Sequence, residues 1–574
     1  MDYISEIQKW LSSEFVSAKE KQEIKAIEND DEKKQLYFGS TMQFGTAGLR
    51  STMNVGPACM NVHTVAQTTQ GIAELVKAEK GDGRGVAIAY DSRNNSPLFA
   101  KTAACVLAAN GIKVYLFDDI RPTPELSFAL RELGCIAGIN VTASHNPKEY
   151  NGYKAYWEDG AQISPEQAKT VSASREKIEL LGGAASCDFD EAVNDGKIVM
   201  LGEDFDEKYL SAVLATQINP DVIKEVSDEL KIVYTPLHGA GRRLVPEVLS
   251  RVGFKHIYTV DEQMIPNGNF PTVKKPNPEY ADVFAQGIEI AEKVGSDLIV
   301  ATDPDADRVG VMSRTSDGTF ATITGNQMGA LMLDYVINAR RERGTLGAHD
   351  YAVKSIVSTD MAYRIAEVCG IKLHDVLTGF KYIGEVIKNY EEGGREGNFI
   401  FGFEESYGYL FGSYARDKDA VGATMMICEM TAYYRKKGMT LSDALVSLYE
   451  RYGFYMEDMT DIYMEGLDGI TRRKQTMQSL RDNPPTEIGG VAVASVGDYS
   501  KCEITDTKTG EKRPTGLIAS DVLYYTLENG DKVIVRPSGT EPKIKIYFLC
   551  HGDDKASVVE KLVHYKKDAQ AFAK

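Results

Sequence analysis

The sequence predicts an α/β protein: three successive α/β domains with mixed, largely parallel sheets, followed by a smaller C-terminal α+β domain. Its 574 residues exceed what one hydrophobic core organises. Short apolar segments alternate with helical patterns over most of the chain, which is typical of parallel sheets. The last part instead carries paired strand-like runs, such as residues 491–496 and 532–535. We therefore expect domains at residues 1–205, 206–325, 326–455 and 456–574.

Composition and charge narrow the class of protein. The chain has 43% hydrophobic and 26% charged residues, and no apolar run is long enough to span a bilayer. Its net charge of −18 argues against a nucleic-acid partner, which would need a broad basic surface. The first residues, MDYISEIQKW, lack the basic and apolar regions of a signal peptide, so we expect a cytoplasmic protein with no membrane partner. The eight cysteines include no CxxC pair, so neither a disulfide framework nor a zinc site is predicted.

The first predicted domain opens with a helix and continues with alternating strands and helices. Ile4, Ile7, Trp10 and Leu11 recur at helical spacing, and a charged, solvated run follows them. Strands are expected at residues 86–90, 113–117 and 135–141, and a helix at 97–110. Another helix should follow Arg121, with Thr123 as its N-cap and Pro124 as its first residue. In such sheets the loops after the carboxyl ends of strands build the functional site.

The strand-then-loop arrangement recurs in the second and third predicted domains. Residues 231–241 form an apolar strand that enters a glycine-rich turn, with a helix expected near 245–252. Further strands are expected at 297–303 and at the start of 351–360. We find no convincing residue-by-residue similarity between these units, so the repeat is one of architecture.

The loop after the strand at 135–141 carries the first reactive group. Ser144 and His145 stand side by side in the segment TASHNP, and a hydroxyl beside an imidazole can act as nucleophile and base. Lys154 adds an ammonium that could hold a phosphate or move a proton. The competing interpretation is a capped turn with a surface serine and histidine.

Asp303, Asp305 and Asp307 form the second reactive group, in the segment DPDADR after an apolar strand. Three carboxylates so close together repel one another unless a cation lies among them. Oxygen ligands favour Mg²⁺, with Mn²⁺ or Ca²⁺ as alternatives. An acidic surface turn is the competing interpretation, and Asp303 could instead be a nucleophile that carries a phosphoryl group.

Several loops suit a phosphorylated polyol. Glu404 and Ser406 could hydrogen-bond to neighbouring hydroxyls, although the segment could also begin a helix. Thr378 and Gly379 precede a helical pattern, whose N-terminus suits an anion. The remaining candidates combine cations, hydroxyls and glycines: Arg50 after the loop FGTAGL, Lys418 in the segment RDKD, and Arg536, Ser538, Gly539 and Thr540 in the segment RPSGT. A plain hairpin is the alternative for the last segment.

Taken together, these motifs resemble those of the α-D-phosphohexomutase family, which comprises phosphoglucomutases and phosphomannomutases. The resemblance runs from residues 44–50 to 536–540 and shows four motifs in family order. The Ser144 loop resembles the phosphoserine loop, and Asp303, Asp305 and Asp307 match the Mg²⁺ loop. Glu404 and Ser406 match the sugar-recognition motif, and the segment RPSGT matches the phosphate-binding loop.

The resemblance also implies roles that the residues alone do not. It implies substrate or phosphate contacts by Arg50, Arg308, Thr378, Gly379 and Lys418, and proton transfer by His145 or Lys154. It further implies one Mg²⁺ held by the three aspartates and Ser144, domains around a central cleft, and a monomer or homodimer.

The implied reaction interconverts glucose 1-phosphate and glucose 6-phosphate through a phosphoserine and glucose 1,6-bisphosphate. The segment TASHNPKEYNGYKAYWEDGAQI is most similar to the long branch of the family, which also contains phosphopentomutase-like and bisphosphate-synthase-like members. Phe380 stands where mannose-accepting relatives carry histidine. Pentose, mannose or bisphosphate-synthase activity therefore remain alternatives, as does a sugar-phosphate-binding protein that has lost catalysis.

Overall fold

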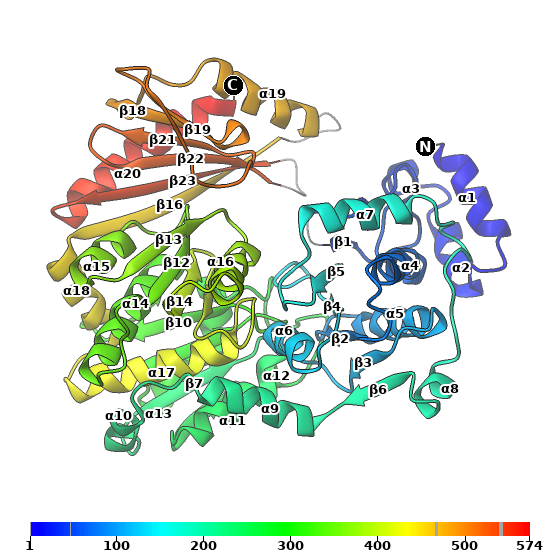
Figure 1. Ribbon diagram of the computed structural model, residues 1–574, viewed down its shortest axis with the longest axis horizontal. Helices are drawn as coiled ribbons and strands as arrows, with labels where there is room; N and C mark the ends of the chain where they lie inside the picture. Colours follow the sequence, from blue (N-terminus) through cyan, green and yellow to red (C-terminus); the bar gives the residue numbers. More distant parts are fainter. Residues whose placement is uncertain (1, 46–47, 465–468, 539–542, 574) are drawn as a thin grey trace. The chain divides into compact units, whose positions relative to one another are not determined.

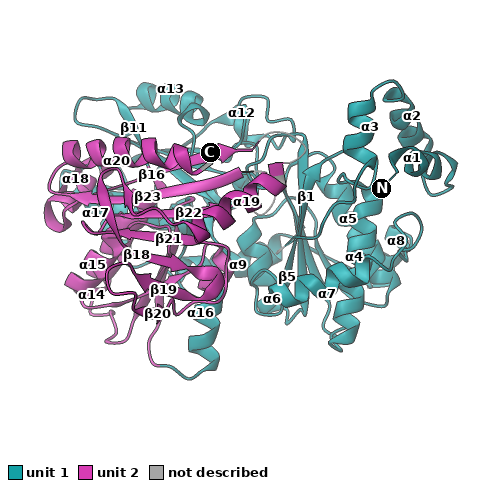
Figure 2. Cartoon of the chain, turned by 90° about the horizontal axis from the view of Figure 1, so that it is seen from above, with its two compact units in different colours: residues 1–323, 384–395, 407–440 teal, residues 324–383, 396–406, 441–574 magenta. Residues whose placement is uncertain are grey.

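The computed structural model describes residues 2–45, 48–464, 469–538 and 543–573. These residues divide into two compact units (Figure 2). Unit 1 comprises residues 1–323, 384–395 and 407–440, and unit 2 comprises residues 324–383, 396–406 and 441–574. Within the described part of the chain, no helix has both the length and the apolar character that crossing a membrane requires.

Unit 1 begins with the helices α1 (Tyr3–Ser12), α2 (Ala18–Ala26) and α3 (Asp31–Phe38). Asp2, Ser17 and Asp30 accept backbone hydrogen bonds at the three N-caps, which satisfies donors that a first helical turn leaves unpaired. Trp10 is fully buried and packs edge-on against Phe38, with 5.7 Å between the ring centroids. The predicted helical segment is confirmed, but the caps at Ser17 and Asp30 divide it.

Among the described residues, the first sheet of unit 1 has six strands in the order β1-β5-β4-β2-β3-β6 (Figure 1). The strands β2, β3, β4 and β6 are parallel, and β5 is antiparallel to both β1 and β4. The strands are β1 (Gly48–Thr52), β2 (Val86–Tyr90), β3 (Val114–Phe117), β4 (Ala137–Val141), β5 (Tyr150–Trp157) and β6 (Ile198–Leu201). The accompanying helices are α4 (Val62–Ala78), α5 (Ser96–Ala109), α6 (Thr123–Glu132), α7 (Pro165–Arg175) and α8 (Phe189–Asn194).

The register of β2 and β4 places two loops at the same edge of this sheet. Every residue of both strands is buried, which explains why each reads as an uninterrupted apolar run. Tyr90 lies opposite Val141, and both are the last residues of their strands. The loops that begin at Asp91 and Thr142 therefore leave the sheet side by side.

The second sheet of unit 1 has the order β11-β10-β9-β7-β8. Here β7, β8 and β9 are parallel, whereas β10 is antiparallel to β9 and to β11. The strands are β7 (Lys231–Thr235), β8 (His256–Thr259), β9 (Leu298–Thr302), β10 (Val309–Arg314) and β11 (Phe320–Ile323). The other elements of this part are α9 (Glu203–Leu214), α10 (Pro220–Val226), α11 (Gly241–Arg251), α12 (Asp261–Met264), η1 (Ala281–Phe284), α13 (Ala285–Val294), β15 (Gly408–Leu410) and α17 (Ala420–Lys436).

Unit 2 contains a parallel group of strands and an antiparallel C-terminal sheet. The strand β12 pairs in parallel with β13 and β14, and the elements here are α14 (Gly325–Glu342), β12 (Tyr351–Ser355), α15 (Met361–Cys369), β13 (Lys372–Val376), β14 (Phe399–Glu404) and α18 (Leu441–Tyr452). The helix α16 (Phe380–Glu392) begins in unit 2, and its residues from 384 onward belong to unit 1. The C-terminal sheet has the order β16-β23-β22-β21-β18-β19-β20, with β17 paired to β18. Its elements are β16 (Phe454–Tyr463), α19 (Gly469–Asp482), β17 (Glu487–Ile488), β18 (Val491–Asp498), η2 (Tyr499–Lys501), β19 (Glu503–Asp506), β20 (Lys512–Pro514), β21 (Leu523–Leu527), β22 (Lys532–Pro537), β23 (Lys543–Gly552), α20 (Lys555–Ala569) and η3 (Gln570–Ala573).

The predicted fold class is confirmed: α/β domains with mixed, largely parallel sheets precede a smaller C-terminal domain with an antiparallel sheet. One local prediction is wrong. Pro122 is the N-cap of α6, and Thr123 is its first helical residue. The hydroxyl of Thr123 bonds elsewhere, as the next subsection describes.

Candidate active site

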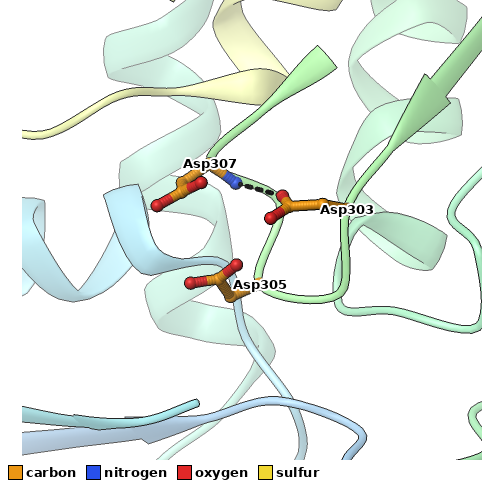
Figure 3. Close-up of side chains that lie close together, drawn as sticks. All are labelled: Asp303, Asp305 and Asp307. Atoms are coloured by element: carbon orange, nitrogen blue, oxygen red, sulfur yellow. Dashed lines mark hydrogen bonds between the residues drawn. The ribbon is translucent and has the colours of Figure 1, made fainter. Parts of the chain in front are cut away.

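The acidic loop joins β9 to β10 by a tight turn. Asp303 and Asp305 have no exposed surface, and Asp307 is 2% exposed. A ligand oxygen from each carboxylate lies within 4.8 Å of the others (Figure 3). Asp303 Oδ1 accepts hydrogen bonds from the backbone nitrogens of Asp307 at 3.1 Å and Arg308 at 3.0 Å, which closes the turn. The competing interpretation of this segment as an acidic surface turn is therefore wrong, because all three carboxylates are buried.

The loop fits a metal ion. Asp305 Oδ1 and Asp307 Oδ1 are buried and have no hydrogen-bond partner among the described residues. An unsatisfied buried carboxylate oxygen is costly, and a cation would remove that cost at both positions. An all-oxygen set suits a hard divalent ion.

Ser144 lies against this loop, 159 residues away in sequence. Its Oγ donates to Asp303 Oδ2 at 2.7 Å and lies 3.0 Å from His145 Nδ1. Ser144 is 3% exposed, so the interpretation as a surface serine is wrong. Its φ of +52° is in the left-handed region, where a non-glycine residue needs support from its surroundings.

Two residues of neighbouring loops supply part of that support. Thr142 Oγ1 accepts a hydrogen bond from the Ser144 backbone nitrogen at 2.8 Å and donates to Asp91 Oδ2 at 2.6 Å. Sequence reasoning did not single out these residues as part of the site. Their signal is their position directly after the apolar strands β4 and β2, which are neighbours in the sheet.

Two lysines and a threonine contact the acidic loop from other elements. Lys154 Nζ, on β5, lies 2.7 Å from Asp305 Oδ2 and 3.2 Å from Asp307 Oδ2. Lys418 Nζ lies 3.3 Å from Asp307 Oδ2 and 2.9 Å from Asp417 Oδ1. Thr123 Oγ1 donates to Asp305 Oδ2 at 2.9 Å, so its hydroxyl binds the acidic loop and does not cap α6 as predicted.

The three carboxyl groups differ in pKa although all are buried. Burial and the charges of Asp305 and Asp307 raise the pKa of Asp303 well above its usual value. Burial also acts to raise the pKa of Asp307, but Lys418, Lys154 and Arg308 outweigh it and hold that pKa below its usual value. Burial and the charge of Asp307 act to raise the pKa of Asp305, but Lys154 and a hydrogen bond with Asp303 together lower it below its usual value. Two of the three groups are thus held as carboxylates.

Proton-transfer candidates show opposite shifts. Burial lowers the pKa of His145 well below its ordinary value, and Arg308 and Arg50 add to that effect. Burial acts to lower the pKa of Lys154 too, but Asp305 and Asp307 raise it above its ordinary value.

The two predicted substrate arginines of unit 1 are held by other side chains. Arg308 Nη1 donates to Glu279 Oε1 at 2.6 Å. Arg50 is exposed and donates to Asn146 Oδ1 at 3.0 Å, on the serine loop. Both therefore lie next to loops that carry the reactive groups.

Unit 2 brings together Thr378, Gly379 and Glu404. Gly379 has a φ of +127° and its nitrogen donates to Glu404 Oε1 at 2.6 Å. Thr378 Oγ1 is buried, with no hydrogen-bond partner in the part of the chain that the structure describes. Glu404 ends β14 and Ser406 lies in the turn after it, so no helix begins here.

The predicted phosphate-binding segment begins in β22, with Arg536 and Pro537. Arg536 lies opposite Lys545 in the β22–β23 pair, and the Ser538 nitrogen donates to the Lys543 carbonyl at 2.9 Å. Arg536 thus lies in a pair of antiparallel strands and shares one face of that pair with Lys545. Gly539 and Thr540 lie outside the described residues.

Comparison with known proteins identifies the class. Models of the phosphoglucomutase/phosphomannomutase family match in order: α/β/α domain I at residues 41–181, domain II at 207–318, domain III at 324–452 and the C-terminal domain at 497–563. The chain therefore belongs to the phosphoglucomutase/phosphomannomutase family and is an enzyme of the isomerase class.

Similar relatives and structures agree. A phosphoglucomutase of Staphylococcus saprophyticus is 36% identical over 518 residues, which covers 90% of this chain and 92% of the relative. One of Staphylococcus aureus is 36% identical over 527 residues, with 92% of each chain covered. The open form of parafusin, a phosphoglucomutase from Paramecium, superposes with a TM-score of 0.69 at 18% identity, covering 93% of this chain and 95% of that one. A phosphoglucomutase/phosphomannomutase family protein of Burkholderia thailandensis gives a TM-score of 0.64 at 17% identity and covers 92% and 97%. These two structures support the fold.

Proposed function

We propose that this chain is a phosphoglucomutase that interconverts α-D-glucose 1-phosphate and glucose 6-phosphate through a phosphorylated Ser144 and glucose 1,6-bisphosphate. The observation that carries the proposal is the 2.7 Å hydrogen bond from Ser144 Oγ to Asp303, inside a buried triplet of carboxylates. The family and the names of the staphylococcal relatives support the choice of reaction.

Asp303, Asp305, Asp307 and an oxygen on Ser144 would hold one Mg²⁺. When bound, this ion would neutralise negative charge on the phosphoryl group. The carboxylates and lysines of the chain supply the remaining electrostatics. Lys154 and Lys418 already lie within 3.3 Å of the triplet, so they would keep compensating its charge while the phosphoryl group moves.

In the proposed step, the bond between phosphorus and Ser144 Oγ breaks as a bond to the free hydroxyl oxygen of the sugar phosphate forms. The proton of that hydroxyl passes to His145 or, where Lys154 has first lost its own proton, to Lys154; Oγ takes the electron pair and is then protonated. Such transfer depends on in-line placement and charge more than on covalent help from the protein. A rigid serine loop is therefore the main contribution of the chain.

We assign recognition of the sugar and of the other phosphate to the remaining predicted residues. Glu404 and Ser406 would bind ring hydroxyls, with Thr378 and Gly379 beside them. The phosphate would be bound by Arg536, Ser538, Gly539 and Thr540, with Arg50, Arg308 and Lys418 contacting substrate or phosphate. The bisphosphate turns round between the two transfers, so each set must accept either end of the sugar.

We also propose the domain limits 1–205, 206–325, 326–455 and 456–574, and a cytoplasmic monomer or homodimer. A charged sugar phosphate does not cross a bilayer unaided, which supports the compartment. Light scattering on the purified chain measures the oligomeric state, and limited proteolysis tests the limits.

The test of the function is Ser144→Ala. With glucose 1,6-bisphosphate supplied, the variant should lose mutase turnover by at least about 10⁴-fold, because the atom that carries the phosphoryl group is missing. Ser172→Ala, on α7, is the matched control and should keep wild-type turnover. Intact-protein mass should show one phosphate on the wild type and none on Ser144→Ala.

Near-normal turnover of Ser144→Ala would refute the phosphoserine mechanism. A phosphate trapped on Asp303 would then indicate that Asp303 is the residue that carries the phosphoryl group. A wild type without phosphate and without turnover after priming would indicate a binding protein. Values of kcat/KM for glucose 1-phosphate, mannose 1-phosphate and ribose 1-phosphate would identify the sugar.

A further inference from the structure

Arg93 binds the serine loop through its backbone carbonyl groups. Its Nη2 donates to the Ser144 carbonyl at 2.6 Å and to that of Asn146, and its Nη1 donates to Pro147 at 2.8 Å and Tyr150 at 3.0 Å. The Arg93 side chain has no exposed surface. A planar guanidinium with acceptors in several directions has one favourable orientation, so it fixes the path of the loop.

Asp91 orients this guanidinium. The Arg93 backbone nitrogen donates to Asp91 Oδ1 at 2.9 Å, and Arg93 Nε lies 3.4 Å from Asp91 Oδ2. The same Asp91 Oδ2 accepts from Thr142, which in turn holds the Ser144 nitrogen. Backbone and side-chain bonds of the loop thus converge on one buried ion pair.

A residue from the second sheet's part of unit 1 covers Arg93. The Arg93 Cζ atom lies 5.1 Å from the centroid of the Phe270 ring, in cation–π geometry. Phe270 is 2% exposed and has a φ of +46°, a backbone conformation that costs a non-glycine residue free energy. The rest of the fold therefore holds the Phe270 ring against the guanidinium although the backbone conformation of Phe270 is itself unfavourable.

The backbone around Phe270 is in close contact with the turn after Arg93. A Cβ atom at Gly268 would lie 2.2 Å from the Asn94 nitrogen and 2.8 Å from the Arg93 carbonyl carbon, so glycine is required there. Asn94 Nδ2 also donates to Asn269 Oδ1 at 3.0 Å. Two independent contacts thus join the segment 267–270 to the Arg93 turn.

We infer that Arg93 and Phe270 are positioning residues that together set where Ser144 Oγ lies relative to Asp303. Ser144 follows β4 of the first sheet and Asp303 follows β9 of the second. The Arg93–Phe270 contact links the serine loop to the part of the chain that carries the acidic loop. This inference rests on the proposed phosphoserine chemistry. Placement decides the rate of phosphoryl transfer, and an error of about 1 Å can cost about 100-fold.

The test uses conservative variants of both residues. Arg93→Lys keeps the charge but cannot reach all four carbonyl oxygens, and we expect kcat to fall about 100-fold with KM within twofold. Phe270→Leu keeps apolar bulk but removes the ring face, and we expect kcat to fall about tenfold. Hydrolysis of phospho-Ser144 in buffer, followed by intact mass, should stay within twofold, because water needs no positioned sugar hydroxyl.

Phe320→Leu is the matched control, because Phe320 contacts Arg314 in the same geometry, at 4.4 Å, away from the serine loop. It should leave kcat unchanged. The double variant Arg93→Lys/Phe270→Leu should lie within threefold of Arg93→Lys, since the two residues act through one contact. Independent, multiplied effects would overturn the inference.

Turnover and the phosphate on Ser144 are measured first in the wild type. Their absence would refute the proposed function, and it would not test the inference about Arg93 and Phe270. With an active wild type, unchanged kcat in Arg93→Lys and Phe270→Leu would overturn the inference. A rise in KM that accounts for the whole loss would do so too, because it would assign these residues to binding. Should Arg93→Lys fail to fold, Phe270→Leu decides alone.

Discussion

The proposed chemical groups of unit 1 and the proposed recognition groups of unit 2 differ in which buried polar atoms the described residues leave without a hydrogen bond: carboxylate oxygens of Asp305 and Asp307 in unit 1, and a hydroxyl oxygen in unit 2. Ser144 Oγ bonds to Asp303, and Lys154 bonds to Asp305 and Asp307, before any ligand arrives. In unit 2, Thr378 Oγ1 is buried without a hydrogen-bond partner among the described residues. The side chains proposed to carry out the reaction are thus already held in position by one another. The Thr378 hydroxyl, which is proposed to contact the sugar, remains able to form a hydrogen bond with it.

The electrostatics of the two regions differ in the same way. In unit 1, lysines compensate buried carboxylates, so that the pKa values of Asp305 and Asp307 are lowered. In unit 2, burial raises the pKa of Glu405 to about 7, and the charge of neighbouring Glu404 adds to this, while Arg536 and Lys545 oppose it. In unit 1, Asp305 and Asp307 therefore remain negatively charged and able to bind a cation. In unit 2, Glu405 is a carboxyl group that is partly protonated near pH 7.

Among the changes that test this comparison of the two units, removal of the cation should produce the largest effect. A small effect would contradict the comparison. Chelation of divalent ions should lower turnover at least about 1,000-fold, because the charge of the triplet then opposes the phosphoryl group. Added Mg²⁺ should restore it. At 100 times its Kd, Mg²⁺ should also stabilise the fold by about 2.7 kcal/mol, measured as a rise in Tm.

Asp307→Asn should abolish that rise in Tm, because it removes one ligand charge. Asp195→Asn, at an exposed position, is the matched control and should retain the rise. A Tm that ignores Mg²⁺ in the wild type would show that the triplet does not hold the ion, whatever happens to turnover.

Arg536→Ala should give the next largest effect. A charged hydrogen bond contributes about 1.5–3 kcal/mol, so KM for glucose 1-phosphate and glucose 6-phosphate should rise roughly 10- to 100-fold with a smaller change in kcat. Arg513→Ala, exposed on β20 of the same sheet, should change neither constant. Equal KM values in wild type and Arg536→Ala would remove this residue from the proposed phosphate contacts.

Thr378→Val should separate recognition from stability. The substitution removes the hydroxyl but keeps the shape, so KM should rise about 3- to 10-fold, at about 1 kcal/mol for a lost neutral hydrogen bond. The free energy of unfolding should stay equal or increase, because a buried polar atom without a partner disappears.

Thr424→Val is the matched control for that experiment. Thr424 Oγ1, on α17, is also buried without a hydrogen-bond partner among the residues described. This variant should be at least as stable as the wild type, with KM unchanged. If Thr378→Val lost stability and kept its KM, the hydroxyl would be structural and not a sugar contact.

The fold could be predicted from sequence wherever the signal was local. The buried strands β2, β4 and β9 read as apolar runs, and the loops after them carry Asp91, Ser144 and Asp303. Thr123 misled because threonine before proline is typical of an N-cap, yet Pro122 takes that place and the hydroxyl bonds to Asp305. A tertiary hydrogen bond prevailed over the local preference.

Contacts between distant segments left no local signal. Arg93 stands in a polar turn that could have been exposed, and nothing in the sequence pairs it with Phe270. The left-handed backbone of Ser144 and Phe270 is equally invisible, because neither residue type favours it. Such features follow from packing, so only the structure reveals which residues position the reactive serine.

The smallest predicted effect concerns the pH dependence of Glu405. Ser355 Oγ donates to Glu405 Oε2 at 3.1 Å, and burial together with the charge of Glu405 raises the pKa of Tyr547. The fold favours the neutral carboxyl group, so its contribution to stability is complete below the usual pKa of 4.5 and is lost as pH rises through about 7. Above that pH the carboxylate also competes with a phosphate for Arg536 and Lys545.

Glu405→Gln should therefore nearly match the wild type at pH 4.5 and depart from it progressively up to pH 8. At pH 8 we expect the variant to be more stable by about 3 kcal/mol and to have a KM about threefold lower. Urea unfolding and initial rates at both pH values measure these differences, with the exposed Glu487→Gln as the control that shows neither. A pH-independent difference in stability would mean that Glu405 has the same pKa in the folded and the unfolded chain, and the contrast between the two units would then rest on Thr378 alone.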